Sequence, residues 1–577
     1  MQESENDFFE QVEKKVLAAT LDCEGDPEAL RSWKKRQRTP DETRARNEAR
    51  FDGDRSAEAV ARRREARRRE VRLAKQRRNR NLLLELHKTQ LTASKGPSKA
   101  PQPLIIGEEA TLDRDEWTTG LHDHCLRTFA EDSGRRREKR ESPGQRYERL
   151  AREAKEEGPP ETRVIPTLAE ILNALAEAAT NKTPGEDQVT SEMWKMLPFE
   201  AKIRIAIHMR RHLVGEGHAR PWSWKLLVMV AVAKHRGPCT LEDHRFLALT
   251  STMSKWYLRV VVLTFRKDEE RLPPREVHTL GFTTAKSTAH LTHAVRLALQ
   301  TAALWKGVGV VIAVMDIQQY FDNMDHADML GAMERRGYRK WILRALQREM
   351  LGLWGEATVA DADPSQIFPF RKGGRTGGVE TPFCANVMLE EALREEVRTW
   401  NAQGLGFNPQ QGSDEQQVPF NHAIWADNVV LLANSPDQLQ RMINGFTRAL
   451  QKKLHMTWKP SSLEVMYSRG YPKTSRRELE TVDQAGRRLI FAEKTKITLL
   501  GDIMDDEGGS QPAREARRAQ ADKVYFRHAH LLERRELPIP ERRAFVKAPA
   551  ASAEYAAQTW TWNMAAALES RSWETRH

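Results

Sequence analysis

The order of apolar and polar residues changes character near Val164. Beyond this point, apolar residues recur every three or four positions over 168–179 and 436–454, which predicts two amphipathic helices. Short runs rich in β-branched residues over 308–316 and 424–433 predict strands. Because helices and strands do not alternate regularly, the pattern favours an α+β fold over a βα barrel.

Residues 1–160 have a different composition. They are rich in charge and poor in aromatic residues, with a Pro/Ser/Lys linker over 91–103 and a second charged run over 135–160. A short apolar patch at 117–129 separates the two. We therefore expect residues 1–160 to form a basic, helical or disordered N-terminal extension, and the packed part of the chain to begin near Val164.

The positive charge of the chain is concentrated in one segment. The 577 residues carry a formal net charge of +12, and Arg31–Arg80 alone holds 20 Lys/Arg against 8 Asp/Glu, also +12. This segment is either a solvated basic helix or a phosphate-binding arm, and it also suits nuclear targeting. Its densest part contains the candidate nucleic-acid-binding residues Arg62, Arg63, Arg64, Arg67, Arg68 and Arg69.

Three classes of protein are excluded by the sequence. No run of about 18 apolar residues is present to span a membrane, and the first residues do not resemble a secretory signal. The four cysteines form no C-x-x-C pair, which excludes a disulfide scaffold and a zinc ribbon. We expect an intracellular protein, nuclear or cytoplasmic, without a membrane partner. The cysteines are Cys23, Cys125, Cys239 and Cys384.

Asp316 is the first candidate for chemistry, because it ends the apolar run 308–316. A carboxylate at the end of a buried strand either caps the following turn or serves as a metal ligand on a rigid element. The acidic residues that follow have a local explanation, since Asp325 is placed as the N-cap of a helix with Asp328 at its N3 position. Asp316 is less easily explained by turn or cap chemistry.

A second candidate lies between two apolar runs, Ala423–Ala426 and Val429–Ala433. Asp427 and Asn428 fill the two-residue gap between them, which predicts a tight β-hairpin turn with a structural role when taken alone. Ser435, followed by proline, then opens a helix. A third segment, Arg371–Leu393, contains four glycines before a helix that opens near Thr381; it is either a ligand-approach loop or an ordinary loop.

Taken together, these segments resemble palm motifs A, B and C of the reverse transcriptases of non-LTR (LINE-type) retrotransposons. In chain order they are 316–322, 375–382 and 426–433. The resemblance covers about 164 to 562. Its further elements are 182–187, 224–255 and 281–288 upstream, and 500–501 and 559–560 downstream.

The resemblance implies a right-hand polymerase with fingers at 161–300, palm at 301–505 and a thumb-like helical region at 506–577. It implies RNA-directed DNA synthesis from dNTPs on an RNA template and a DNA primer. Nucleotidyl transfer uses two Mg²⁺ (or Mn²⁺) ions about 3.5–4 Å apart, held by hard oxygen ligands. By resemblance, Asp316, Asp427 and Asn428 are catalytic, and the metal ligands are Asp316, Asp427 and the backbone carbonyl of Ile317.

The same resemblance implies a nucleotide-binding set. Lys234 and Arg245 stabilise the charge of the triphosphate. Phe321 occupies the position at which the family has the aromatic residue that excludes a ribose 2′-hydroxyl. Taken outside the motifs, Lys234 and Arg245 are ordinary surface cations. The remaining residues of the implied set are Ile317, Arg375 and Gly377.

The sequence departs from the family pattern at three places. Asn428 replaces the second aspartate of motif C, Thr376 replaces a glutamine in motif B, and serines stand at the expected motif D lysine, with Lys453 and Lys459 as alternatives. The chain is therefore either an active polymerase or a catalytically decayed nucleic-acid-binding protein. A third alternative, an unrelated helical nucleic-acid-binding protein, requires Asp316 and Asp427 to lie far apart. Since we recognise no nuclease domain, we expect a separate endonuclease to supply the primer end.

Overall fold

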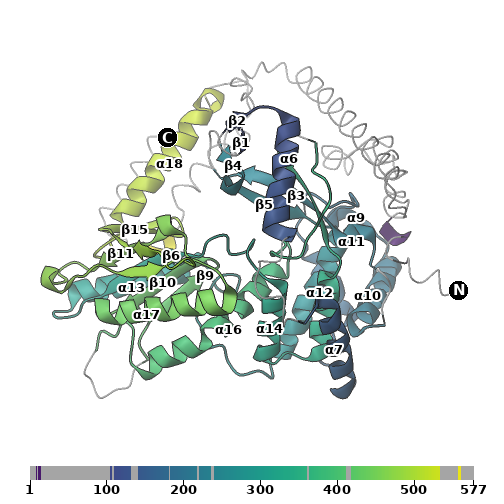
Figure 1. Ribbon diagram of the computed structural model, residues 1–577, viewed down its shortest axis with the longest axis horizontal. Coiled ribbons are helices and arrows are strands. Elements are labelled where there is room, and N and C mark those ends of the chain that lie inside the picture. Colours follow the sequence, from purple (N-terminus) through teal and green to yellow (C-terminus); the bar gives the residue numbers. More distant parts are fainter. Residues whose placement is uncertain are drawn as a thin grey trace. The chain divides into compact units, whose positions relative to one another are not determined.

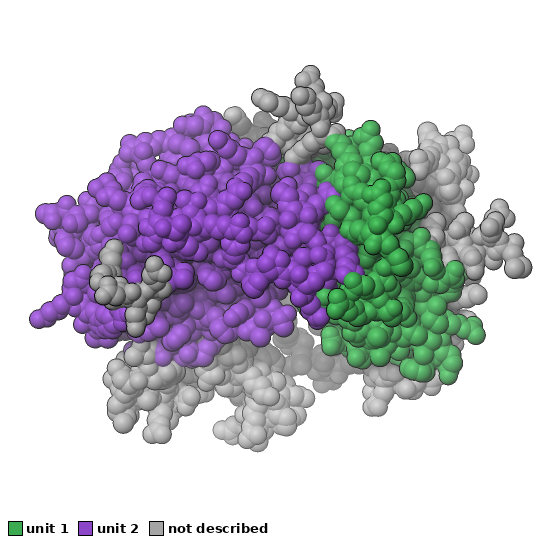
Figure 2. Space-filling view, turned by 90° about the horizontal axis from the view of Figure 1, so that it is seen from below, with its two compact units in different colours: residues 1–267, 340–379 green, residues 268–339, 380–577 purple. Residues whose placement is uncertain are grey.

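The computed structural model describes residues 8, 11–13, 104–106, 109–130, 141–180, 182–216, 220–234, 239–359, 363–410, 418–532 and 557–560 (Figure 1). The six candidate nucleic-acid-binding arginines of the basic segment lie outside these residues. The chain divides into two compact units, unit 1 (1–267 and 340–379) and unit 2 (268–339 and 380–577), coloured separately in Figure 2. Each unit is described by itself.

Unit 1 is built on a four-stranded sheet with the order β5-β3-β7-β8. Strand β3 pairs antiparallel with β5 and parallel with β7, and β8 pairs antiparallel with β7. The strands are β3 (Leu226–Ala233), β5 (His244–Leu249), β7 (Trp354–Val359) and β8 (Phe368–Pro369). A smaller sheet has the order β2-β1-β4, formed by β1 (Leu104–Ile106), β2 (Glu109–Thr111) and β4 (Cys239–Thr240).

The core of unit 1 begins well before Val164, contrary to our expectation. Helix α6 (Arg114–Cys125) places Trp117 and Leu121 in the same hydrophobic cluster as Leu227 of β3 and Phe246 of β5. The apolar residues of α6 recur every four positions, so they form one helical face, but the charge on either side conceals this face in the sequence. Part of the expected extension therefore belongs to the core of unit 1.

Further helices complete unit 1, and their starts follow the capping rules. Ser142 and Thr167 each begin a helix with a capping box, in which the side chain and the backbone exchange hydrogen bonds. The helix expected over 168–179 ends at Ala176. The helices are α7 (Pro143–Glu156), α8 (Leu168–Ala176), α9 (Ser191–Met196), α10 (Phe199–Val214), α11 (Trp222–Lys225), α12 (Thr252–Glu269, which continues two residues into unit 2) and α15 (Lys340–Met350).

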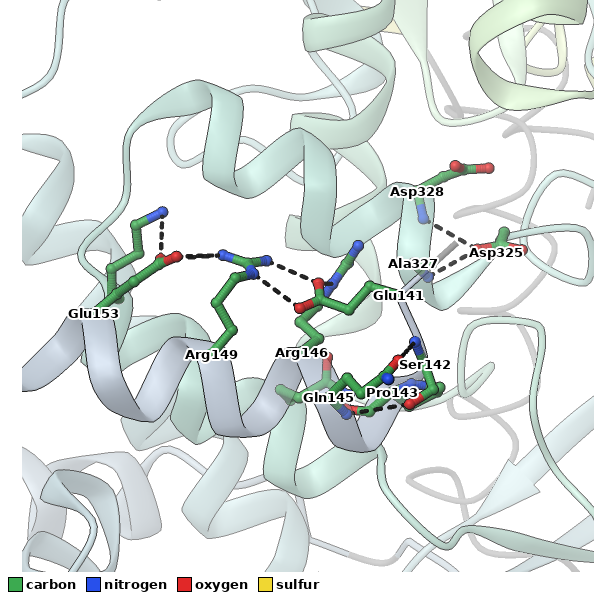
Figure 3. Close-up of polar contacts among 12 residues, drawn as sticks. Glu141, Ser142, Pro143, Gln145, Arg146, Arg149, Glu153, Asp325, Ala327 and Asp328 are labelled. Atoms are coloured by element: carbon green, nitrogen blue, oxygen red, sulfur yellow. Dashed lines mark hydrogen bonds and ion pairs between the residues drawn. The ribbon is translucent and has the colours of Figure 1, made fainter. Parts of the chain in front are cut away.

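An ionic chain runs along α7, as Figure 3 shows. Arg149 donates to Glu141 at 3.0 Å and to Glu153 at 2.9 Å, and Lys340 of α15 lies 3.2 Å from Glu153. The pairs are partly exposed, so each contributes about 1 kcal/mol or less. Their main consequence is orientation, because the Lys340–Glu153 pair connects α15 to α7.

Unit 2 contains a five-stranded sheet with the order β14-β11-β6-β10-β9. The central strand β6 pairs antiparallel with both β10 and β11. This arrangement agrees with the expected α+β class. The strands are β6 (Val311–Asp316), β9 (His422–Trp425), β10 (Asn428–Ala433), β11 (Glu464–Tyr467) and β14 (Ala492–Glu493).

Both faces of this sheet are covered. On one face, Ile312 and Val314 of β6 share a cluster with Leu291 and Val295 of α13 (Thr288–Leu304). On the other face, α17 (Pro436–Ala449) contacts β6 and β10. Because β6 is buried on both sides, its sequence reads as an unbroken apolar run. The remaining large helices of unit 2 are α14 (His326–Arg336), α16 (Thr381–Ala402) and α18 (Gln511–Leu532).

Several predicted boundaries in unit 2 are confirmed. Asp325 caps α14 by accepting from the backbone amides of Ala327 and Asp328, as Figure 3 also draws. Ser435 caps α17, and α16 begins at Thr381. The chain after α17 continues as a π-helical turn to Leu454. Two hairpins follow, β12–β13 (Glu480–Val482 and Arg488–Ile490) and β15–β16 (Lys496–Leu499 and Asp502–Asp505). Among the described residues, no helix is long and apolar enough to cross a membrane.

Candidate active site

Asp316 and Asp427 meet at one end of the sheet of unit 2. Asp316 ends β6 and pairs with Asn428, the first residue of β10. The amide of Ile317 donates a hydrogen bond of 2.9 Å to the carbonyl oxygen of Asp427. The two aspartates are thus adjacent, although 110 residues separate them in sequence, and the alternative that requires them far apart is excluded.

The hairpin carrying Asp427 is present, but its turn lies one residue earlier than we expected. Trp425 and Asn428 form the last pair of β9 and β10, so Ala426 and Asp427 occupy the turn. Ala426 has a φ of 56°, a left-handed conformation that is unusual for alanine. The predicted turn at Asp427-Asn428 is therefore wrong. As a result, Asn428 is held in the strand opposite Asp316.

Burial and the neighbouring Asp427 change the acidity of Asp316. Burial, followed by the negative charge of Asp427, raises the pKa of Asp316 to about 6, and the charge of Lys459 acts in the opposite direction. Glu464 on β11 adds to the rise. Two carboxylates in such a site favour a proton or a cation between them.

The segment after α17 fixes the backbone around Asp316. The amide of Lys459 donates to the carbonyl oxygen of Asp316 at 2.9 Å, and the amide of Asp316 donates to Oγ of Ser462 at 2.9 Å. Of the two lysines that the sequence left as alternatives, Lys459 therefore lies beside the carboxylates. Lys453 instead forms an ion pair with Glu395 at 3.3 Å.

Ile317 and Phe321 follow Asp316 in sequence, in unit 2. Ile317 is buried, whereas Phe321 is partly exposed. The ring centroids of Phe321 and Tyr320 lie 5.4 Å apart. Tyr320 donates a hydrogen bond of 2.7 Å to the carbonyl oxygen of Ala385, and burial raises its pKa. The aromatic pair is thereby anchored to α16.

The segment before α13 packs against the hairpin. The amide of Leu280 donates to the carbonyl oxygen of Ile424 at 2.8 Å, and Ile424 donates to His278 at 3.0 Å. A Cβ atom at Gly281 would lie only 2.7 Å from the backbone nitrogen of Ala426. Glycine is thus required for this close approach. It brings the next residue, Phe282, near Phe321. The sequence placed Phe282 within the motif at 281–288 but assigned it no role in the site.

Lys234 and Arg245 lie in unit 1, Lys234 directly after β3 and Arg245 on the neighbouring strand β5. Lys234 follows β3; its amide donates to the carbonyl of Asp243 at 2.8 Å and its Nζ to that of Glu242 at 2.7 Å. Arg245 is exposed on β5, paired with Val232 of β3. Both cations therefore belong to one end of the sheet of unit 1.

Arg375 and Gly377 lie in a loop alongside β5, also in unit 1. The amide of Ala248 donates to the carbonyl oxygen of Thr376 at 2.8 Å. Gly377 has a φ of 105°, and a Cβ atom there would lie 3.3 Å from the carbonyl oxygen of Ala248. The tight contact explains the glycine. Arg375 is buried at 4% exposure.

The structure thus groups the candidate residues in two sets. Asp316, Ile317, Phe321, Asp427 and Asn428 lie together in unit 2, while Lys234, Arg245, Arg375 and Gly377 lie around β5 in unit 1. Within the described part of the chain, no group of three or more His, Cys, Asp or Glu side chains is arranged to hold a metal. The oxygen atoms that the first set offers come from two carboxylates, an amide and backbone carbonyls.

Comparison with known proteins gives partial matches of low identity. No family model matches the chain. Over 173 residues, 29% of this chain and 18% of the relative, it is 27% identical to the RNA-directed DNA polymerase from mobile element jockey of Drosophila melanogaster. The probable RNA-directed DNA polymerase from transposon BS of the same species is 27% identical over 172 residues, again 29% of this chain and 18% of the relative.

A third relative covers more of the chain. It is the Retrovirus-related Pol polyprotein from type-1 retrotransposable element R2 of Nasonia vitripennis, 23% identical over 284 residues, 48% of this chain and 25% of the relative. The matches thus span about a quarter or less of the length of these curated relatives. Together with the meeting of Asp316 and Asp427, they identify the chain as similar to the reverse transcriptases of non-LTR retrotransposons.

Proposed function

We propose that this protein is an RNA-directed DNA polymerase that extends a DNA primer on an RNA template with dNTPs. The observation that carries the proposal is the pairing of Asp316 on β6 with the hairpin of Asp427. It is supported by the order of the motifs and by the names of the curated relatives. In this proposal, unit 2 contains the palm, unit 1 the fingers, and the region from 506 onward the thumb.

The residues present fit a divalent cation. Asp316 and Asp427 supply hard carboxylate oxygens, the donor type that Mg²⁺ prefers, and Ile317 and Asn428 add carbonyl and amide oxygens. The raised pKa of Asp316 supports this proposal, because a bound cation offsets both the burial and the repulsion by Asp427 that raise it. When bound, Mg²⁺ or Mn²⁺ would supply Lewis acidity to the primer hydroxyl and the phosphates.

The other residues act on the nucleotide in this proposal. Lys234 and Arg245 bind the triphosphate; the ammonium of Lys234 has three donors, so its bond to Glu242 leaves room for a phosphate oxygen. Lys459, beside the carboxylates, donates a proton to the departing pyrophosphate. Phe321 excludes a ribose 2′-hydroxyl, and the loop carrying Arg375 and Gly377 positions the template and nucleotide.

Primer extension on poly(rA)/oligo(dT) tests the proposal. We expect Mg²⁺- or Mn²⁺-dependent extension by the unchanged protein and a loss of at least a hundredfold for Asp427→Ala, since the variant removes half of the carboxylate pair. Asp437→Ala, which removes an exposed carboxylate of α17 paired with Arg477, is the matched control and should retain activity. Extension by Asp427→Ala at the unchanged rate contradicts the proposal.

A catalytically decayed nucleic-acid-binding protein is the second candidate function. It is favoured by Asn428, which contributes no charge and donates from its amide to Oδ1 of Asp427 at 3.3 Å. This candidate predicts RNA or DNA binding that depends strongly on salt but not on Mg²⁺ or on Asp427. The extension assay separates the two candidates, because only the first predicts product.

A further inference from the structure

Phe282 has two unusual properties at one position. Its side chain is 50% exposed, although it is large and apolar. Its φ is 58°, in the left-handed region that a bulky residue rarely adopts. An exposed aromatic residue on a strained backbone suggests a function rather than a role in folding.

The backbone at this corner is held from several sides. The side-chain amide of Asn386 donates a buried hydrogen bond of 2.7 Å to the carbonyl oxygen of Gly281. Leu280 is bonded to Ile424 of β9, and Gly281 approaches Ala426 too closely for any side chain. These contacts explain how the left-handed conformation of Phe282 is maintained. They also fix its position relative to the hairpin of Asp427.

Phe282 ends a short row of aromatic rings. Its ring lies edge-on to that of Phe321, with centroids 6.3 Å apart and planes at 73°. Phe321 in turn contacts Tyr320, which is 2% exposed and bonded to Ala385. Phe321 therefore contacts both a buried tyrosine and the exposed Phe282. Edge-to-face pairs of this kind have preferred geometries and restrict each other's rotation.

We propose that Phe282 is a positioning residue for Phe321 and thereby contributes to the discrimination between deoxyribonucleoside and ribonucleoside triphosphates. The inference rests on the proposed polymerase function, in which Phe321 excludes the 2′-hydroxyl. Without the Phe282 ring, Phe321 can rotate away from the sugar, and the barrier against a ribonucleotide becomes lower. The effect on deoxyribonucleotides is small, because they have no 2′-hydroxyl to exclude.

Single-nucleotide incorporation tests the inference. For Phe282→Ala we expect the ratio of kcat/KM for dNTP to that for rNTP to fall about threefold to tenfold, mainly through a lower KM for the rNTP. Phe282→Gly should behave like the alanine variant although it relieves the backbone strain, and Phe282→Tyr should retain the ratio. In a Phe321→Ala background, Phe282→Ala should add nothing, as expected for residues that act together.

Phe199→Ala is the matched control, because Phe199 is exposed to a similar degree, 62%, at the start of α10 in unit 1. Primer extension with an unchanged dNTP/rNTP ratio in Phe282→Ala overturns the inference and leaves the polymerase proposal intact. An equal loss of kcat for both nucleotides also overturns it, since this points to a role in folding or in template contact. No extension by the unchanged protein instead contradicts the polymerase proposal.

The effect of Phe282 on the position of the Phe321 ring can also be measured without catalysis. With 4-fluorophenylalanine at position 321, the ¹⁹F chemical shift reports the ring environment directly. We expect Phe282→Ala to move or broaden this resonance and Phe199→Ala to leave it unchanged. An unchanged resonance in Phe282→Ala shows that the two rings do not restrict each other and overturns the inference.

Discussion

Asn428 sets the charge of the candidate active site. It pairs with Asp316 across β6 and β10, and its amide Nδ2 donates to Asp427. The sequence identified this residue and its lost charge, but assigned it to the turn. The strand register shows that the backbone of Asn428 is paired with that of Asp316. Replacing its amide with a carboxylate of the same size therefore changes the charge directly beside the two aspartates.

For Asn428→Asp we expect the Mg²⁺ concentration at half-maximal primer extension to fall by about tenfold, which corresponds to 1.4 kcal/mol. The added carboxylate replaces an amide donor with a charged oxygen ligand. Without Mg²⁺, the same variant should melt at a lower temperature because three carboxylates then repel one another. A titration of extension rate against Mg²⁺ measures the first effect.

The control for this change is Asn444→Asp on the exposed face of α17. It adds the same charge away from Asp316 and Asp427, and we expect it to leave the Mg²⁺ dependence unchanged. If Asn428→Asp and Asn444→Asp behave alike, Asn428 does not contribute to a cation site.

At the scale of elements, a buried ion pair connects α13 to the hairpin β15–β16. Arg296 donates from Nη2 to Asp502 at 2.8 Å, and from Nη1 to the carbonyl oxygens of Gly508 and Gly509 at 2.9 and 2.6 Å. The two side chains are 2% and 1% exposed. Nothing in the sequence pattern marked this pair, because its members lie more than 200 residues apart.

For Arg296→Met we expect a loss of about 3–5 kcal/mol in the free energy of unfolding, because Asp502 is left buried without its partner. Urea denaturation of the full chain measures the loss. The double variant Arg296→Met/Asp502→Asn should recover part of it. Arg469→Met, which breaks the exposed pair with Glu507, should cost about 1 kcal/mol or less. Equal losses for the two arginine variants would show that burial of the pair is not decisive.

Element prediction succeeded where the signal was local. The caps at Asp325 and Ser435 depend on residues within three positions, and both are confirmed. Element prediction failed where contacts between residues far apart in sequence decide the structure. The face of α6 was concealed by flanking charge, and the register of the β9–β10 turn depends on Gly281, which packs against Ala426 from a distant segment.

At the scale of the whole chain, the two units are not continuous in sequence. Residues 268–339 belong to unit 2, yet the chain on either side of them belongs to unit 1. Our expected boundaries at 161–300 and 301–505 assumed continuous segments, since composition changes only along the chain. Assignment of the fingers and palm to these units remains a proposal.

Glu13, close to the N-terminus, is buried within unit 1. Its carboxylate accepts hydrogen bonds from Trp224 at 2.8 Å, Ser223 at 2.6 Å and Ser251 at 3.2 Å. Burial, with the negative charge of Asp187, raises the pKa of Glu13 from 4.5 to about 8. A residue of the expected N-terminal extension is therefore part of the interior of unit 1.

This shift predicts a pH dependence of stability. The folded state retains the proton of Glu13 up to about pH 8, while the unfolded chain releases it near pH 4.5. Folding thus takes up a proton between these values, and the contribution of Glu13 to stability decreases as the pH rises from about 4.5 to 8. Urea unfolding followed by tryptophan fluorescence at several pH values should show this decrease.

We expect Glu13→Gln to reduce the pH dependence, because the amide does not titrate. Glu216→Gln, at an exposed carboxylate of unit 1 paired with Arg211, should leave it unchanged. If Glu13→Gln and the unchanged protein lose stability in parallel between pH 5 and 8, Glu13 is not the group responsible.

The basic segment predicts a strong dependence of nucleic-acid binding on salt. Each neutralised phosphate releases counterions, so the logarithm of affinity falls with the logarithm of salt concentration by about 0.7–0.9 per contact. Changing all six candidate arginines to glutamine should make this slope shallower by several units. Fluorescence anisotropy with a labelled RNA at 50–200 mM salt measures the slope. The absence of any change in slope would contradict the role of this segment as a phosphate-binding arm. The residues changed are Arg62, Arg63, Arg64, Arg67, Arg68 and Arg69.

The sequence by itself determined several elements and helix caps, the order of the motifs and the identity of Asp316 and Asp427 as candidates, because periodicity, caps and residue type are local properties. Tertiary structure decided which groups meet. The pairing of β6 with β10 places Asn428 opposite Asp316. The segment after α17 brings the backbone of Lys459 to Asp316, whereas Lys453 pairs with Glu395. Contacts between residues far apart in sequence depend on strand register and helix packing, which no local pattern in a single sequence specifies.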